Sequence, residues 1–460
     1  MSPAASPLDR SIPPATGPTR SFRLPAFERS RLGPGVDLLV APLERTSMVH
    51  LEVVTPASAA WDPVELPGLA AMTASMLDEG SSKRNAFEIA AGVERLGGQL
   101  STGTGWNSTT LVFDALAQHL RSGLSLLAEV LGDPVFPEGE LERLRSRTLS
   151  ELQRRRSLPA SLAARQYAHA LYGDGLYGHP ILGTEESVTA ITREDVDRFY
   201  RSHVLAAPAT VIASGALDPS DLLTDARELV ACLTGDPLGS GQSVEPRLAE
   251  GPRVFVVDRP EATQTELRIG HVGVARAHPD ATALTVLNSV LGGKFTSRLM
   301  LSLRERLGLT YSVRSSFARR LDRGPFTIAA AVETAGAGEA VRESLIELER
   351  MRDEEISDSE LADAQNFILG VFPYTVQTIA GVAHRLREIA VHGLGDDHWD
   401  RYPEMIRDVT VGDVRRVAGE HLRPSEIVVV AVGPAEQLTT QLEPFGTLDT
   451  WRPADRDRPL

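Results

Sequence analysis

Three small residues in the run GLAAMTASMLDEG (68–80) stand at a spacing that could do chemistry. On a helix, Ala71, Ala74 and Ser75 share one face, because residues three and four apart are neighbours there. The same spacing lets an H-x-x-E-H motif place two zinc-binding imidazoles beside a general base. Alanine and serine side chains can neither bind zinc nor act as that base. Residue chemistry alone therefore favours a face of small side chains that packs inside a buried helix.

Other candidate ligands are histidines that lie close to carboxylates. The segment HGLGDDH could bind a metal adventitiously if it forms a turn, through His392, Asp396, Asp397 and His398. His169 and His179 flank LYGDGLYG, and we expect them to be structural. The single cysteine, Cys232, excludes an intrachain disulfide and a cysteine-based zinc site. We find no nucleophile elbow, Walker loop or dinucleotide fingerprint in the sequence.

The composition is that of a soluble globular protein and excludes some partners. The chain has 460 residues, a hydrophobic fraction of 42% and a formal charge of −15. An acidic chain lacks the basic face that nucleic acid requires, so we expect no nucleic-acid partner. No apolar run approaches the roughly 18 to 20 residues that span a bilayer. Residues 1–22 lack an apolar signal segment and predict a disordered arm, which makes a cytoplasmic location the default expectation.

An internal repeat indicates that one structural unit is present twice. The segments 191–215 and 409–433 align with an offset of 218 residues. The matched pairs are Thr192 with Thr410, Asp195 with Asp413, Val196 with Val414, His203 with His421, and Gly215 with Gly433. In each copy Thr-x-x-Asp predicts a helix start, and an amphipathic helix and a β-branched strand follow.

The pattern of elements predicts an α+β protein with two similar halves. Each half starts with strands, continues into helix, returns to strand and ends with helices. We expect each half to be a sandwich-like sheet with helices on one face, and the two halves to close as a clamshell. The predicted segments are an N-terminal arm (1–22), a first domain (23–233), a linker (234–252), a second domain (253–440) and a C-terminal tail (441–460).

The run LPGLAAMTASMLDEGSSKRNAFEIAAGVERLGGQLSTGT (66–104) resembles the signature of the pitrilysin/insulinase family of zinc metallopeptidases. In that family G-L-A-H-x-x-E-H-M-L leads through G-T-x-x-R to a helix that ends in L-G-G. The segment YGHPILGTEESVTAITREDVDRFY (177–200) is similar to the same family further along the chain. The resemblance covers about residues 23–440 and includes the organisation in two halves.

The resemblance implies that the zinc site of the first half is degenerate. By position, Ala71 and Ser75 stand where the zinc histidines belong, and Ala74 stands where the catalytic glutamate belongs. The third ligand of the family is a Glu roughly 76 residues after the second histidine, which here is Glu151. A single carboxylate has no useful zinc affinity, so we interpret Glu151 as a solvated or salt-bridged helix residue. We expect this chain to bind no metal.

A second implication concerns the run GGKFTSRLMLSLRERLGLTYSV (292–313) in the second half. An Arg followed seven residues later by a Tyr completes the active site in the family, and Arg304 and Tyr311 have that spacing. Peptide hydrolysis builds negative charge on the scissile oxygen, to which a Tyr hydroxyl can donate, while a guanidinium can donate to a neighbouring carbonyl. The segment GQLSTG (98–103) matches a strand edge that pairs with extended substrate in the family.

These implications give three hypotheses for function. The first is a substrate-binding subunit of a heteromeric zinc metallopeptidase, inactive alone, which supplies Arg304 and Tyr311 in trans to an H-x-x-E-H subunit. Its partners would be that zinc-containing subunit and peptide substrates. The second is a decayed structural subunit, as in the core subunits of the respiratory cytochrome bc complex. The third is a peptide-binding clamshell without hydrolysis.

Overall fold

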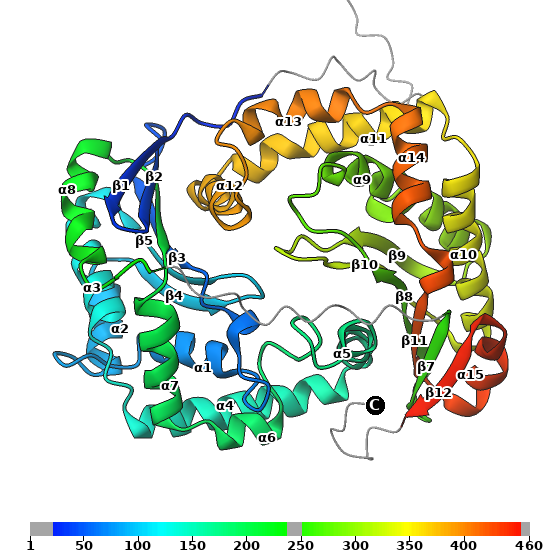
Figure 1. The fold of residues 1–460 in the computed structure, drawn as a ribbon, viewed down its shortest axis with the longest axis horizontal. Coiled ribbons are helices and arrows are strands. Elements are labelled where there is room, and N and C mark those ends of the chain that lie inside the picture. The colour runs from blue at the N-terminus through cyan, green and yellow to red at the C-terminus, as the bar shows by residue number, and fades with distance from the viewer. Residues whose placement is uncertain (1–21, 237–250, 452–460) are drawn as a thin grey trace, which may run out of the picture.

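The computed structural model describes residues 22–236 and 251–451, which form two halves, each built on a six-stranded sheet (Figure 1). The strands of the first sheet, in spatial order, are β1 (Glu28–Gly33), β2 (Val36–Pro42), β6 (Ala209–Gly215), β3 (Met48–Thr55), β5 (Thr109–Leu116) and β4 (Gln99–Thr104). Those of the second are β12 (Thr447–Trp451), β7 (Arg253–Asp258), β11 (Val428–Gly433), β8 (Gln264–Val272), β10 (Pro325–Glu333) and β9 (Thr310–Phe317). The predicted α+β class with two similar halves is therefore confirmed.

The helices follow the strands in the same way in both halves. In the first half they are α1 (Leu69–Met76), α2 (Ala86–Arg95), α3 (Leu120–Gly132), α4 (Glu138–Ser157), α5 (Pro159–Tyr172), α6 (Glu185–Ala190), α7 (Arg193–Phe199) and α8 (Pro219–Val230). In the second half they are α9 (Ala281–Asn288), α10 (Ala337–Asp353), α11 (Asp358–Val371), α12 (Ile379–His392), α13 (His398–Arg407), α14 (Val411–His421) and α15 (Ala435–Leu442). Two π-helical segments, η4 (Ser289–Gly293) and η5 (Met300–Arg306), follow α9.

Five strands of each sheet have the same order and direction. A parallel pair, β2 with β6 or β7 with β11, lies beside an antiparallel strand, β3 or β8. The sixth strand differs, because β1 comes from the N-terminal side and is antiparallel, whereas β12 comes from the C-terminal side and is parallel. The range 441–460, predicted as a tail, therefore contributes a strand to the second sheet. Residues 1–21 of the predicted arm and 237–250 of the predicted linker lie outside the described residues.

The repeat found in the sequence is present in the structure. The hydroxyl of Thr192 accepts a hydrogen bond from the backbone N–H of Asp195 at 3.2 Å, and Thr410 does the same with Asp413 at 3.1 Å. In both copies the aspartate carboxylate accepts a hydrogen bond from the threonine backbone N–H, which completes a capping box. These caps start α7 and α14, and the central strands β6 and β11 follow them.

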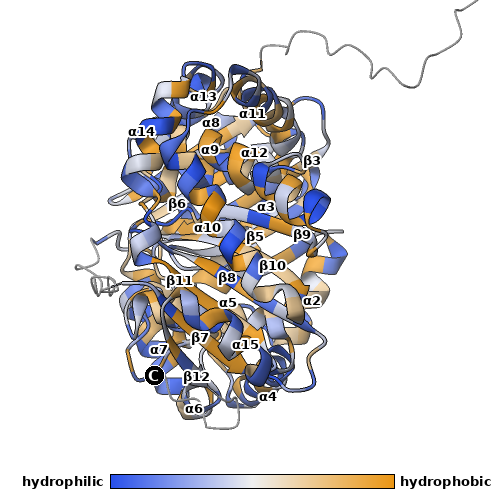
Figure 2. Ribbon diagram, turned by 90° about the vertical axis from the view of Figure 1, so that its right-hand side faces the viewer, coloured by the Kyte–Doolittle hydropathy of each residue, from blue (hydrophilic) through white to orange (hydrophobic). Residues whose placement is uncertain are grey.

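The two halves exchange helices. Helix α5 of the first half packs on β8 and β11 of the second sheet, and α12 of the second half packs on β3 and β6 of the first sheet. Tyr167 on α5 donates to the carbonyl of Phe326, and Ser214 on β6 donates to the carbonyl of Ile379 at 2.8 Å. Each sheet therefore has helices of its own half on one face and a helix of the other half on the opposite face. Burial on both faces agrees with the continuous apolar strands, several of which are orange in Figure 2.

Charged groups also connect the halves. The guanidinium of Arg387 on α12 pairs with the carboxylate of Glu52, which is 1% exposed on β3. The Arg320 guanidinium, at the tip of the β9–β10 hairpin, lies 5.0 Å from the ring centre of Trp106 and 4.3 Å from that of Tyr177 in the first half. Such cation–π contacts are stronger when water is excluded, so this contact also holds the halves together.

Within residues 22–236 and 251–451, no single helix has the length and apolar character of a membrane span. Two consecutive segments, Asp358–Val376 and Ile379–His392, pass that test only as a pair, and they bend by 111° at their junction.

Candidate functional site

Helix α1 carries the three small residues and is held at its start by a buried carboxylate. The Oδ atoms of Asp62 accept hydrogen bonds from the backbone N–H groups of Gly68 and Ala70, each at 2.7 Å. Gly68 has a φ of 96°, which favours glycine at this N-cap. Ala74 is 2% exposed, whereas Ala71 and Ser75 are partly buried. The predicted helix is confirmed, and its small face leaves no metal-binding atom at these positions.

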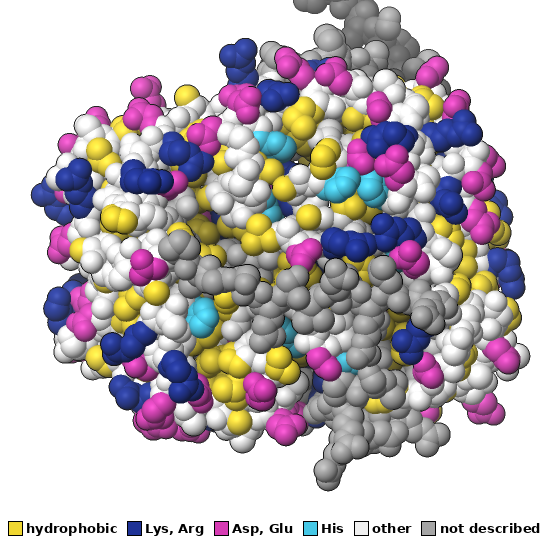
Figure 3. Space-filling view, in the orientation of Figure 1, with side chains coloured by type: hydrophobic (Ala, Val, Ile, Leu, Met, Phe, Trp, Pro, Cys, Tyr) yellow, Lys and Arg dark blue, Asp and Glu magenta, His cyan; other side chains and the backbone are white. Residues whose placement is uncertain are grey.

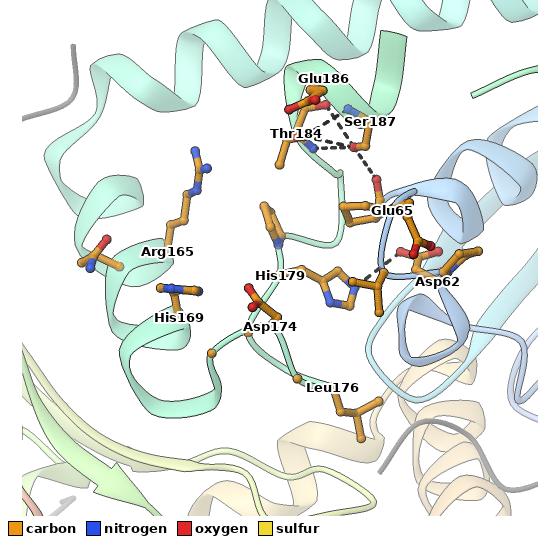
Figure 4. Close-up of a pocket in the computed structure, with 18 of the residues that line it drawn as sticks. Asp62, Glu65, Arg165, His169, Asp174, Leu176, His179, Thr184, Glu186 and Ser187 are labelled. Carbon is orange, nitrogen blue, oxygen red and sulfur yellow. Dashed lines mark hydrogen bonds and ion pairs between the residues drawn. The ribbon is translucent and has the colours of Figure 1, made fainter. Parts of the chain in front are cut away.

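A cavity of about 490 Å³ lies beside the start of α1 (Figure 4). His179 points toward Asp62, with its Nε2 3.5 Å from the carboxylate and 3.1 Å from the carbonyl of Ala59. Burial raises the pKa of Asp62, although the bonds from His179 and two backbone N–H groups favour its ionised form. His179 therefore supports the carboxylate that starts α1, which is a structural role. His169 lines the same cavity from α5.

Glu151 is bound by arginines of its own helix. Its carboxylate accepts hydrogen bonds from Arg154 at 2.8 Å and from Arg155 at 2.7 Å. These two guanidinium groups, Arg154 first, lower the pKa of Glu151 to about 2. The structure therefore shows the salt-bridged helix residue that the sequence predicts.

The structure brings Arg304 and Tyr311 together. The guanidinium carbon of Arg304, on η5, lies 5.0 Å from the ring centre of Tyr311 on β9. Gly308 makes the turn between them with a φ of 65°. The backbone N–H of Leu309 donates a hydrogen bond to the carbonyl of Leu303 at 2.8 Å. A π-helical segment is rare and often occurs at functional sites. Local chain geometry therefore places a cation and a phenol side by side.

An aromatic residue that the sequence analysis missed completes this group. The ring centre of Phe295 lies 4.6 Å from the guanidinium carbon of Arg304, so this cation contacts two aromatic rings. Phe295 is 66% exposed and Tyr311 is 85% exposed, although both are large apolar rings. We call Phe295, Arg304 and Tyr311 the aromatic–arginine group. Solvent-exposed aromatic rings around a cation are typical of a surface that contacts a ligand or partner.

The two sheets present equivalent edges. Strand β4 pairs with β5 and ends the first sheet, and β9 pairs with β10 and ends the second. The segment 98–103, predicted to be a strand edge, therefore does lie at one. Edge strands offer backbone groups to an extended peptide, and Tyr311 stands on the corresponding edge of the other half.

The histidines and aspartates of HGLGDDH do not meet at one point. Asp396 pairs with Arg29, Asp397 with Arg401, and His398 contacts Arg276. Among residues 22–236 and 251–451, the group whose possible ligand atoms all lie within 4.8 Å of one another is a different one, namely His278, Asp280 and His421. The sequence did not indicate this group, because His421 is far from the other two residues along the chain.

Ion pairs already satisfy much of that group. The Nε2 of His421 lies 2.7 Å from the Asp280 carboxylate, which also accepts a bond from Arg416 at 2.7 Å. Arg416 first, and His421 next, lower the pKa of Asp280 to about 2. A guanidinium on the carboxylate competes with a cation, so the arrangement ties α14 to the start of α9.

Comparison with known families identifies the class of protein. The model of the insulinase family (peptidase family M16) matches residues 40–185, and the model described as the peptidase M16 inactive domain matches residues 190–368. The two matches together cover most of both halves. The chain belongs to peptidase family M16, the insulinase family, which confirms the resemblance seen in the sequence.

Relatives and solved structures agree with this assignment. The chain is 27% identical over 364 residues to an uncharacterized zinc protease of Streptomyces coelicolor, covering 77% of this chain and 78% of the relative. It is 27% identical over 373 residues to one of Mycobacterium tuberculosis, covering 80% and 84%. The crystal structure of a peptidase M16 inactive domain from Pseudomonas fluorescens matches with a TM-score of 0.83 at 26% identity, covering 89% of this chain and 98% of that one. A protease from Helicobacter pylori shares the fold, with a TM-score of 0.83 at 20% identity over 89% and 100% of the two chains.

Proposed function

We propose that this chain is the substrate-binding, non-catalytic subunit of a heteromeric zinc metallopeptidase. The observation that carries the proposal is a contrast within the chain. The aromatic–arginine group is assembled with both aromatic rings exposed, whereas α1 presents Ala71, Ala74 and Ser75 at the positions of the family's zinc motif. The residues of α1 do not fit zinc, and no metal-dependent step is assigned to this chain. The zinc proteases among its relatives support a partner that holds the metal.

In this role the chain would bind peptide and stabilise charge. The edge of β4 would pair with an extended peptide through backbone hydrogen bonds. The hydroxyl of Tyr311 would donate to the oxygen that becomes negative during hydrolysis, and Arg304 would donate to a neighbouring carbonyl. Phe295 and Tyr311 restrict the Arg304 guanidinium from two sides, which reduces the entropy lost when it binds.

Reconstitution with an H-x-x-E-H chain tests the proposal. The purified chain with zinc should not cleave peptides, and adding the partner should restore cleavage. Tyr311→Phe removes one donor and should lower kcat of the complex by about 100-fold, since single oxyanion donors contribute that much. Tyr374→Phe is the matched control, because Tyr374 is also exposed (69%) in the second half and lies outside the group.

Three results would contradict the proposal. Full activity of the Tyr311→Phe complex would remove the role of that hydroxyl. Cleavage by the isolated chain would show that it is catalytic by itself. Stable peptide binding by the single chain, without any gain in cleavage when a partner is present, would favour a non-hydrolytic clamshell. The heteromeric partner and the cytoplasmic location stay predictions.

A further inference from the structure

In the second half, three arginines surround the carboxylate of Glu388. Arg276 follows β8, Arg319 follows β9, and Arg385 is on α12. Their guanidinium groups all pair with Glu388, Arg276 at 3.9 Å and Arg319 at 3.1 Å from the same oxygen, Oε1. In the described part of the chain these three cations have no other carboxylate partner.

Three positive charges against one negative charge leave an excess of two. The side chains of Arg276, Arg385 and Glu388 are only 8%, 11% and 8% exposed. On the face shown in Figure 3, by contrast, Lys and Arg side chains are interspersed with Asp and Glu. Unbalanced buried charge is costly unless a counter-charge accompanies it. Arg276 and Arg385, the two buried guanidinium groups, share one carboxylate, so a further anion beside them would be stabilised.

The neighbouring histidines do not supply additional charge. Burial first, and the charge of Arg276 next, lower the pKa of His392 and of His398 to about 4. Although burial favours protonation of Glu388, the three guanidinium groups lower its pKa, so it stays ionised. The excess of two positive charges therefore persists at neutral pH.

A small pocket adjoins two of these arginines. It has a volume of about 130 Å³, and its walls include Arg276, Arg319, Ser316 and Asn288 beside the apolar side chains of Leu284 and Phe317. The volume suits a few water molecules or one small ligand. The Nε of Arg276 is buried and faces Oε1 of Glu388 at 3.9 Å, which is beyond hydrogen-bond distance. Arg319 is 45% exposed and stands at the mouth.

We infer that this pocket binds a small oxyanion, a carboxylate or a phosphate, between Arg276 and Arg319. Guanidinium groups form paired, charge-assisted hydrogen bonds with such anions. Arg276 supplies a buried guanidinium in the pocket wall, Arg319 supplies an exposed one, and the Ser316 hydroxyl adds a neutral donor. The anion offsets the positive charge of the arginines that the single carboxylate of Glu388 does not balance. This inference is independent of the proposed peptidase role, because it involves neither the aromatic–arginine group nor α1.

Calorimetric titration of the purified chain with sodium phosphate, and separately with sodium acetate, tests the inference. Ionic strength is held constant with sodium chloride, because screening alone alters exposed charges. We expect saturable binding of one phosphate or one acetate per chain. Arg319→Gln should weaken it by at least about tenfold, since a hydrogen bond to a charged group contributes at least that much.

Arg314→Gln is the matched control, because Arg314 is an exposed arginine on β9 that does not line the pocket. It should bind phosphate as the wild type does. Arg276→Gln provides a second variant on the buried wall, with circular dichroism to verify its fold. Absence of saturable binding of both anions, or equal affinities in wild type and Arg319→Gln, would overturn the inference.

Discussion

The two halves of the molecule share a sheet topology but differ in what they present on it. In the first half α1 packs against α4, α7 and β4, and the central Ala74 is 2% exposed. In the second half the two rings of the aromatic–arginine group are exposed, Phe295 to 66% and Tyr311, on the edge strand β9, to 85%. Packing explains the residues of the first site, because a small side chain is what a close helix contact accepts. Packing does not explain a cluster of exposed aromatic rings, so function is the better explanation there.

The largest expected effect comes from restoring a carboxylate inside α1. Ala74→Glu places a charged group at a position that is only 2% exposed. We expect the free energy of unfolding to fall by about 3 kcal/mol or more. Ala71→Glu, at a partly exposed position on the same helix, should cost less than about 1 kcal/mol. Urea unfolding followed by circular dichroism measures both.

This pair of variants can break the comparison between the halves. If Ala74→Glu unfolds no more easily than Ala71→Glu, then the first half retains room for a catalytic carboxylate, and packing has not replaced the site.

A second difference between the halves concerns one buried histidine on each of two equivalent strands. His50 on β3 lies 2.8 Å from Asp114 and 3.8 Å from Glu52. Burial opposes its charge, but these carboxylates outweigh burial and raise the pKa of His50 to about 9. His271 on β8 is hydrogen-bonded to the carbonyl of Val272 through Nδ1, and its Nε2 accepts from the backbone N–H of Arg423. Burial lowers the pKa of His271 to about 4.

The two histidines should give the unfolding free energy opposite pH dependences. His50 has a folded pKa above its ordinary value of 6.5, so its contribution is complete below pH 6.5 and is lost as pH rises toward about 9. His271 has a folded pKa below 6.5, so its contribution is complete above pH 6.5 and is lost as pH falls toward about 4. Each is worth about 3 kcal/mol by linkage. Urea unfolding at a series of pH values measures both slopes.

Two single variants test whether each pH dependence of the unfolding free energy comes from the histidine of one half. His50→Gln should flatten the alkaline side, and His271→Gln should flatten the acidic side. Should either variant leave its slope unchanged, then that histidine does not hold the charge state described, and the contrast between the equivalent strands fails.

The sequence predicts the elements of the fold better than their partners. The Thr192 and Thr410 caps, the strands after them and helix α1 follow from local patterns, because caps and apolar periodicity act within a few residues. The exchange of α5 and α12 does not follow, since an apolar helix face shows that it is buried but not against which sheet. The sequence predicts a tail over 441–460 instead of the strand β12 for the same reason, since the pairing of β12 with β7 joins residues that are distant in the chain.

The candidate site residues likewise include some that the sequence locates and some that it misses. Spacing and family resemblance locate Arg304 and Tyr311, and the structure brings them together. Phe295 was missed because an aromatic residue in an apolar stretch is ordinarily a core residue, and only its 66% exposure distinguishes it. The arginines around Glu388 were missed because they come from three separate elements of the second half.

The smallest expected effect on stability is at the aromatic–arginine group itself. The double variant Arg304→Gln/Tyr311→Phe removes a guanidinium, whose Nε lies 3.4 Å from the exposed carboxylate of Glu305, and the hydroxyl of the exposed Tyr311. An ion pair with an exposed carboxylate and an exposed hydroxyl contribute little to folding, so the free energy of unfolding should change by less than about 1 kcal/mol. Urea unfolding measures this change, and the same preparation is assayed with the H-x-x-E-H partner. Unchanged stability with lost activity would sharpen the division between a packing site in the first half and a functional site in the second. A loss of stability comparable to that of Ala74→Glu would instead make the group a structural element, and the halves would no longer differ in kind.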